Sequence, residues 1–220
     1  MKEVEISSKE KTKLSNANSK EDFESAISEI KTWRNLDHPN IIKYYSSFIE
    51  KNTVYIVMEL ITGMTIKEYI KHLSNKGNIS NRSSDTTEKE VIKITLDILS
   101  ALKYLHNEKE VIYRDMNPNN IMIDADFNVK LIDFGLARDS SSKEQELSMS
   151  TAFVGSVMYC SPEVMKDTPY TEKADIWAFG CIIYELLTLT PAFIGDNPLI
   201  IAKNVVDAVY IKLDESVNQV

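Results

Sequence analysis

The segment "VIYRDMNPNNIMIDADFNVKLIDFG", residues 111–135, places three polar side chains around one short turn and two apolar runs. Asp115 precedes the turn, Asn120 ends it, and Asp133 follows the second apolar run. A carboxylate before a strand can orient an attacking hydroxyl and accept its proton, and carboxylate and carboxamide oxygens are ligands that Mg²⁺ prefers. The spacing therefore predicts a site for metal ions and a phosphorylated ligand.

Each part of this pattern is weak by itself. A lone aspartate in a turn is usually a local cap, and "NPNN" alone is typical of turns. No glycine precedes Gly63, so a glycine-rich phosphate loop is missing from the front of the sequence. The full set still favours a site, because an Arg-Asp pair, an asparagine five residues on, two strands and "DFG" follow one another in order.

Composition narrows the class of protein. The 220 residues are 43% hydrophobic and carry a net charge of -8, which disfavours a nucleic-acid surface or an anionic-membrane patch. Cys160 and Cys181 lack CxxC spacing, so we expect reduced thiols and a cytoplasmic location. The first residues lack the apolar stretch of a signal peptide, and the most apolar segment, 176–189, is too short to span a bilayer.

Hydrophobic periodicity predicts strands in the first part of the chain and mostly helices afterwards. This order favours an α+β protein with two unequal lobes. The strands are expected at 2–6, 41–48, 53–60, 121–124 and 129–132, and the helices at 21–36, 64–73, 86–107, 173–188 and 197–209.

The motifs resemble those of a known family. "YRDMNPNN" followed by "DFG" is similar to the catalytic loop and metal-binding triplet of protein kinases. "SPE" at 161–163 and "DIWAFG" at 175–180 continue the resemblance in family order. "HPNIIKYYSSF", "YIVMEL" and "GSVMYCSPEV" resemble the NIMA-related (Nek) kinases, and the asparagine-rich loop, "MKEV" and "VMELITG" resemble a divergent branch of them.

The resemblance implies a bilobal protein-kinase-like fold. Residues 1–60 would form a partial N-lobe sheet with its C-helix, and residues 61–220 a mainly helical C-lobe without its last helices. The implied activity transfers the γ-phosphate of ATP, with Mg²⁺, to serine or threonine hydroxyls of a protein substrate. No nucleic-acid or membrane partner is implied, and nuclear or cytoskeletal association is the alternative to a purely cytoplasmic location.

The resemblance also assigns roles to individual residues. Asp115 would be the catalytic base, Asn120 and Asp133 would hold Mg²⁺, and Lys2 would pair with Glu29, although Lys2 beside the first methionine is also typical of an exposed end. Four positions would surround adenine: Met58 as gatekeeper, Glu59 and Ile61 through their backbone, and Met122 as the floor, with Asp133 also contacting the nucleotide through its metal.

Further positions would regulate the site. Arg114 would bind a phosphate on the activation segment, where Ser148, Ser150 and Thr151 are candidate acceptors, and Ser156 would contact the base. Asp175 would tie its helix to the catalytic loop; an ordinary helix cap is the alternative, and capping can also be part of the same tie. An aromatic stack, the regulatory spine of kinases, would contain Trp33, Tyr44, Tyr113 and Phe134.

Several features depart from the family pattern. Asn117 replaces a lysine that helps neutralise the transferring phosphoryl group, and Tyr113 replaces the usual histidine. Glu163 is expected to be buried without the arginine that normally pairs with it. Because strands before residue 1 and helices after residue 220 are missing, we expect a fragment or an incomplete gene model, which alone would be poorly soluble and inactive.

Two hypotheses about function remain at this point. The first is an active kinase, and the second is a catalytically dead kinase-like scaffold or binding module. The joint presence of Asp115, Asn120 and Asp133 favours the enzyme, because only metal binding and catalysis require all three. Ser156 and the lack of an arginine after Asp115 favour serine/threonine transfer, while Asn117 leaves dual specificity open.

Overall fold

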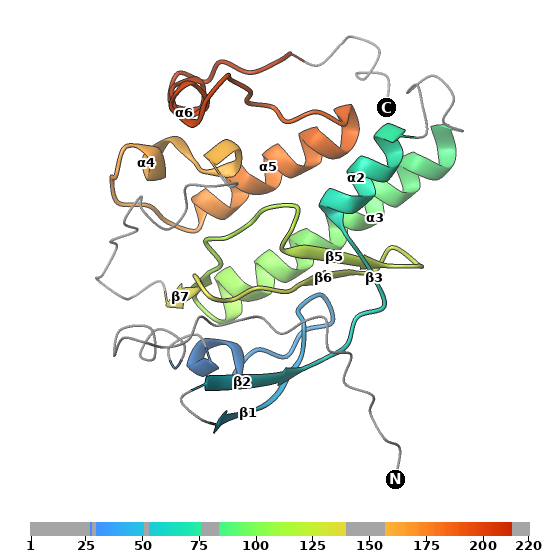
Figure 1. Ribbon diagram of the computed structural model, residues 1–220, viewed down its shortest axis with the longest axis vertical. Helices are drawn as coiled ribbons and strands as arrows, with labels where there is room; N and C mark the ends of the chain where they lie inside the picture. The colour runs from blue at the N-terminus through green and yellow to red at the C-terminus, as the bar shows by residue number, and fades with distance from the viewer. Residues whose placement is uncertain (1–26, 28–29, 51–52, 76–83, 140–156, 213–220) are drawn as a thin grey trace.

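The computed structural model describes residues 27, 30–50, 53–75, 84–139 and 157–212. A β-hairpin and the helical residues 30–33 form one end of the molecule, and the larger helices form the other (Figure 1). Two small sheets lie between them, so the described chain has the α+β arrangement that the order of elements predicts.

The hairpin pairs β1 (Tyr44–Glu50) with β2 (Thr53–Met58) in antiparallel register. Phe48 stacks on Tyr55 with ring centroids 5.0 Å apart, a cross-strand aromatic pair of the kind that stabilises two-stranded ribbons. Tyr45, Phe48 and Ile49 are each more than half exposed. Because successive side chains of a strand point to opposite faces, Phe48 and Ile49 do not share one, so apolar side chains are exposed on both faces and not only on the single face expected from the sequence.

The central sheet has the strand order β3–β5–β6, with β3 at Gly63–Thr65, β5 at Ile121–Asp124 and β6 at Val129–Leu131. Gly63 lies so close to β5 that a Cβ atom there would come within 2.0 Å of the Ile123 oxygen. The helix expected directly after Gly63 therefore begins later, as α2 (Ile66–Asn75), because residues 63–65 pair with β5 first.

One further short sheet and one isolated bridge complete the β-structure of the described residues. β4 (Val111–Ile112) pairs antiparallel with β7 (Arg138–Asp139). A parallel bridge between Ile41 and Leu131 connects the segment before β1 to β6. The β4–β7 pairing holds the two ends of residues 111–139 side by side, and the bridge joins the segment before β1 to the central sheet.

The helical end is built around two long helices. α3 spans Ser84–Lys103 and continues into a π-helical turn at Tyr104–Glu108, and α5 spans Lys173–Thr188. Both were expected from the sequence, and the predicted apolar stripe is buried along α3 and into the π-helical turn: Val91, Ile94, Ile98, Leu102 and Leu105. The shorter helices are η3 (Val157–Tyr159), α4 (Pro162–Met165) and α6 (Pro198–Val206).

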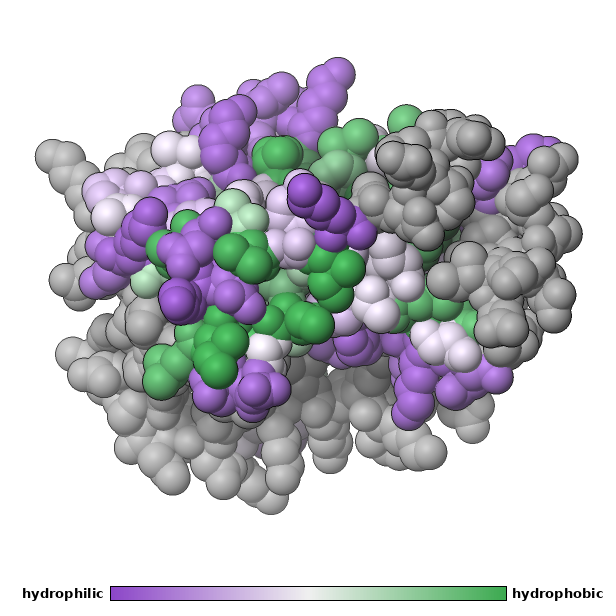
Figure 2. Space-filling view, turned by 90° about the horizontal axis from the view of Figure 1, so that it is seen from above, coloured by the Kyte–Doolittle hydropathy of each residue, from purple (hydrophilic) through white to green (hydrophobic). Residues whose placement is uncertain are grey.

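The outer face around α6 carries exposed apolar side chains (Figure 2). Leu199 is 75% exposed, and Ile194, Val209 and Tyr210 are each about half exposed. Asn197 caps α6 by accepting a hydrogen bond from the Ile200 amide, and Pro198 occupies its first turn. Within the described residues no helix combines the length and apolar character needed to cross a membrane.

Candidate active site

The loop between β4 and β5 holds Asp115 by both of its carboxylate oxygens. Asn117 Nδ2 donates to Oδ1 at 2.9 Å, and Asn120 Nδ2 donates to Oδ2 at 2.7 Å. The same two amide groups also donate to the Asp115 backbone oxygen, at 3.1 and 3.0 Å. Because both oxygens and the backbone are engaged, the carboxylate is held in one orientation before any ligand binds.

The electrostatic surroundings of Asp115 disfavour its ionised form. Burial, and after it the negative charge of Asp133, raise the pKa of Asp115, and the hydrogen bonds from Asn120 and Asn117 oppose that rise. A cation between two carboxylates would remove their repulsion. The site therefore has the electrostatic character of a place that binds a positive ion.

Asp133 and Asn120 offer the oxygen atoms for such an ion. Asp133 follows β6, and its Oδ1 accepts a hydrogen bond from the Gly135 amide at 2.9 Å. Asn120 gives its amide hydrogens to Asp115, and no described residue donates to its Oδ1. The described residues contain no group of three or more His, Cys, Asp or Glu side chains that could together hold a metal ion. Mg²⁺ suits this sparse set, because it usually keeps waters and takes further oxygens from substrate phosphates.

Asp175, in the first turn of α5, fastens the catalytic loop to the core. Its Oδ2 accepts a hydrogen bond from the Tyr113 amide and its Oδ1 one from the Arg114 amide, each at 2.8 Å. His106 Nε2 lies 2.7 Å from Oδ2. The N-cap position of α5 is Glu172, and Asp175 accepts its hydrogen bonds from the loop rather than from amides of its own helix. The expected tie is therefore confirmed, and the alternative of an ordinary helix cap is wrong.

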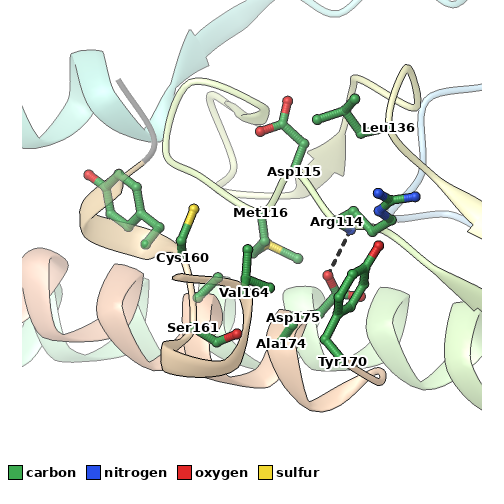
Figure 3. A pocket seen from close by; sticks show the side chains of 12 residues that line it. Arg114, Asp115, Met116, Leu136, Cys160, Ser161, Val164, Tyr170, Ala174 and Asp175 are labelled. Atoms are coloured by element: carbon green, nitrogen blue, oxygen red, sulfur yellow. Dashed lines mark hydrogen bonds between the residues drawn. The ribbon is translucent and has the colours of Figure 1, made fainter. Parts of the chain in front are cut away.

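This tie supports an unusual backbone conformation next to Asp115. Arg114 has a φ of 71°, in the left-handed region, which costs a non-glycine residue on the order of 1–2 kcal/mol. The hydrogen bond from its amide to Asp175 holds that conformation. The Arg114 guanidinium lies 5.2 Å from the centre of the Tyr170 ring, and Figure 3 shows the ring beneath it.

The four aromatic residues expected to stack are in contact. Phe134 of the "DFG" triplet stacks on Trp33 at 5.9 Å between centroids and meets Tyr113 edge-on at 5.2 Å. Trp33 also contacts Tyr44 edge-on at 5.8 Å, and its indole N–H donates to the Ile42 oxygen. A continuous aromatic column thus runs from the hairpin to the catalytic loop, as predicted.

The expected adenine-binding positions lie at the end of β2, just after it, and on β5. The Glu59 amide donates to the Lys43 oxygen, and its carboxylate lies 2.8 Å from Lys130 Nζ. The Glu59 oxygen and the Ile61 amide make no backbone hydrogen bond with another described residue, so both suit a ligand. Met58 packs at the edge of the core and Met122 is buried. The roles of all four positions in nucleotide binding stay predictions.

Two other sequence expectations change in detail. Asn117 is buried, and its oxygen accepts from the Asn119 amide, so its side chain stabilises the loop as well as Asp115. Glu163 is only partly buried, which removes the expected cost of an isolated buried carboxylate. Six predicted site residues lie outside the described residues, and their roles stay predictions: Lys2, Glu29, Ser148, Ser150, Thr151 and Ser156.

A cavity with about 520 Å³ of empty space, partly open to solvent, adjoins Asp115 (Figure 3). Catalytic-loop residues 114–116, residues 159–161 and the start of α5 line it. Burial raises the pKa of the Cys160 thiol to about 11, with a smaller contribution from Asp115. Sequence reasoning missed this cavity because its walls come from segments far apart in the chain.

Comparison with known proteins agrees with this geometry. The protein kinase domain family matches residues 2–219, and the chain belongs to that family. The described hairpin and helical end correspond to the two lobes of its α+β fold.

Among curated proteins the chain is similar to NIMA-related kinases. It is 43% identical to the human serine/threonine-protein kinase Nek10 over 182 residues. These aligned residues make up 83% of this chain and 15% of Nek10. It is 39% identical to human Nek2 over 173 residues, 76% of the chain and 37% of Nek2. It is 36% identical to nekl-2 of Caenorhabditis elegans over 181 residues, 81% of the chain and 49% of nekl-2. The chain thus spans less than half of each of these three relatives.

Proposed function

We propose that the protein transfers the γ-phosphate of Mg-ATP to serine and threonine hydroxyls of a protein substrate. One observation carries the proposal: Asp115 is held on both carboxylate oxygens by Asn117 and Asn120, beside a second carboxylate, Asp133. The membership of the chain in the protein kinase family and its likeness to serine/threonine kinases support the same activity.

Different residues of the chain would supply different parts of the phosphate transfer. Asp115 orients the acceptor hydroxyl and takes its proton as the oxygen attacks. Asn120 and Asp133 would hold the metal, and Glu59 and Ile61 would bind adenine through backbone groups. When bound, Mg-ATP supplies the phosphoryl group and the positive charge that neutralises it. Asp175 keeps the Asp115 loop in place through the Tyr113 and Arg114 amides.

The cavity beside Asp115 suits the peptide around the acceptor residue. It opens next to the proposed base, and its lining is largely apolar, with Met116, Leu136 and Val164 among the walls. We therefore assign it to the substrate rather than to the nucleotide. The proposed location is the cytoplasm, whose reducing environment would suit the thiols of Cys160 and Cys181.

The test measures phosphate transfer by the full-length protein from radiolabelled ATP to a generic protein substrate, followed by phosphoamino-acid analysis. We expect phosphoserine and phosphothreonine, with transfer lost in Asp115→Asn. No transfer above that variant would support the inactive scaffold instead, and phosphotyrosine alone would overturn the proposed acceptor class.

A further inference from the structure

Glu185 is a buried carboxylate that the phosphate chemistry does not use. It lies in the second half of α5, and its side chain is 1% exposed. Its Oε2 accepts a hydrogen bond from the Tyr159 hydroxyl at 2.5 Å, and its Oε1 accepts one from Lys67 Nζ at 2.9 Å. A buried carboxylate needs such partners, and Lys67 and Tyr159 satisfy one oxygen each.

The two partners come from segments that adjoin the catalytic loop. Lys67 is in the first turn of α2, and its amide donates to the Pro118 oxygen, within that loop, at 3.0 Å. Tyr159 ends η3 and lines the cavity beside Asp115. Burial, and then the charge of Glu185, raise the pKa of Tyr159, so its hydroxyl stays neutral and donates. Glu185 therefore lies beneath the surface over which a peptide substrate would pass.

The side chains of Lys67 and Glu185 differ in their exposure to solvent. The Lys67 side chain is 46% exposed, whereas Glu185 is almost fully covered. A peptide meets the ammonium of Lys67 first and reaches the carboxylate only if that ammonium is removed. Charges at an interface select partners by repulsion as well as by attraction, so this arrangement disfavours basic side chains.

We propose that Lys67 is a substrate-specificity residue that covers Glu185 and presents a positive charge, so that the enzyme favours acidic over basic side chains at one position of the peptide. The inference rests on the proposed kinase function. It concerns which substrate is accepted and leaves the transfer chemistry unchanged.

The experiment compares peptide libraries with the full-length protein, scanning Asp, Ala and Arg through each position around the acceptor. Lys67→Met removes the charge and uncovers Glu185, and Lys67→Met combined with Glu185→Gln removes both charges. Lys67→Arg keeps the positive charge. Lys71→Met is the matched control, because Lys71 is an exposed lysine one helical turn further along α2.

We expect the unaltered protein to prefer Asp over Arg at one position. Lys67→Met should raise the ratio of kcat/KM for Arg to that for Ala there by about tenfold, the scale of one partly screened charge pair. The double variant should lose that gain, and Lys67→Arg and Lys71→Met should leave the ratio unchanged. Measuring ratios separates specificity from a general loss of stability.

Three results would overturn the inference. The first is equal use of Asp and Arg at every position by the unaltered protein, which needs no variant to fold. The second is a uniform change across all peptides in Lys67→Met, which would indicate a structural role alone. The third is no transfer to any peptide by the unaltered protein, which would refute the kinase function as well, whereas the first two leave that function standing.

Discussion

Replacing Asp175 with asparagine tests how the catalytic loop is held. The carboxylate is 1% exposed and has three nitrogen partners: the Tyr113 and Arg114 amides at 2.8 Å and His106 Nε2 at 2.7 Å. Asparagine keeps one acceptor oxygen and turns an NH₂ group toward at least one N–H donor. One or two charge-assisted hydrogen bonds are lost, and a buried donor is left without an acceptor.

The size of the effect follows from these contacts. Hydrogen bonds to charged groups contribute about 1.5–3 kcal/mol each, and breaking a buried charged cluster costs about 3–5 kcal/mol. We therefore expect Asp175→Asn to lower the free energy of unfolding by about 3–5 kcal/mol. Without these bonds Arg114 can leave its left-handed conformation at φ 71°, so kcat should also fall.

Urea unfolding, followed by tryptophan fluorescence, measures the first effect, and phosphate transfer measures the second. Asp126→Asn is the control, because Asp126 is an exposed aspartate in the turn between β5 and β6 and should change stability by no more than about 0.5 kcal/mol. A loss below about 1 kcal/mol in Asp175→Asn would show that the loop is held by other contacts.

Three other outcomes are expected. Asp115→Asn should lower kcat at least about 100-fold with little change in KM for ATP, and radiolabelled transfer assays would contradict a base at Asp115 if turnover persisted. Burial, and then the charge of Asp133, raise the pKa of Asp115, and a base acts only when it is ionised. The fall of kcat/KM at low pH should therefore have an apparent pKa above the ordinary aspartate range, and an apparent pKa within that range would contradict this expectation. Gly63→Ala places a Cβ atom against the Ile123 oxygen, so the melting temperature should fall, and an unchanged value would show that β3 can shift without loss.

Patterns within one element were predictable from the sequence. The apolar density of residues 173–188 indicated α5, whose bounds the structure reproduces, and alternation indicated the β1–β2 hairpin. The positions around Asp115, Asn120 and Asp133 followed from motif order. These features depend on neighbours in the chain, which a sequence displays directly.

Features that depend on distant partners were not predictable in this way. A helix was expected to begin directly after Gly63, whereas residues 63–65 take a strand conformation from β5, about sixty residues further on. Lys67 and Glu185 are 118 positions apart, and the available signal was only a carboxylate within an apolar helix. Glu163 was expected to be buried by analogy alone, and its partial exposure could not be derived from local pattern.

The π-helical turn at Tyr104–Glu108 is a place where the insertion or deletion of one residue would disrupt contacts on both of its sides. Such a turn inserts one extra residue into a helix, and each residue of an α-helix rotates the next by about 100°. The Tyr104 hydroxyl accepts a hydrogen bond from the Asp37 amide, and His106 lies against Asp175 of α5. Side chains of this turn therefore contact both the segment before the hairpin and the helical end. Deleting one residue here would restore a regular helix and swing one of these contacts out of place. Natural insertions and deletions among related chains should therefore avoid this turn and collect in exposed loops such as the one around Asp126.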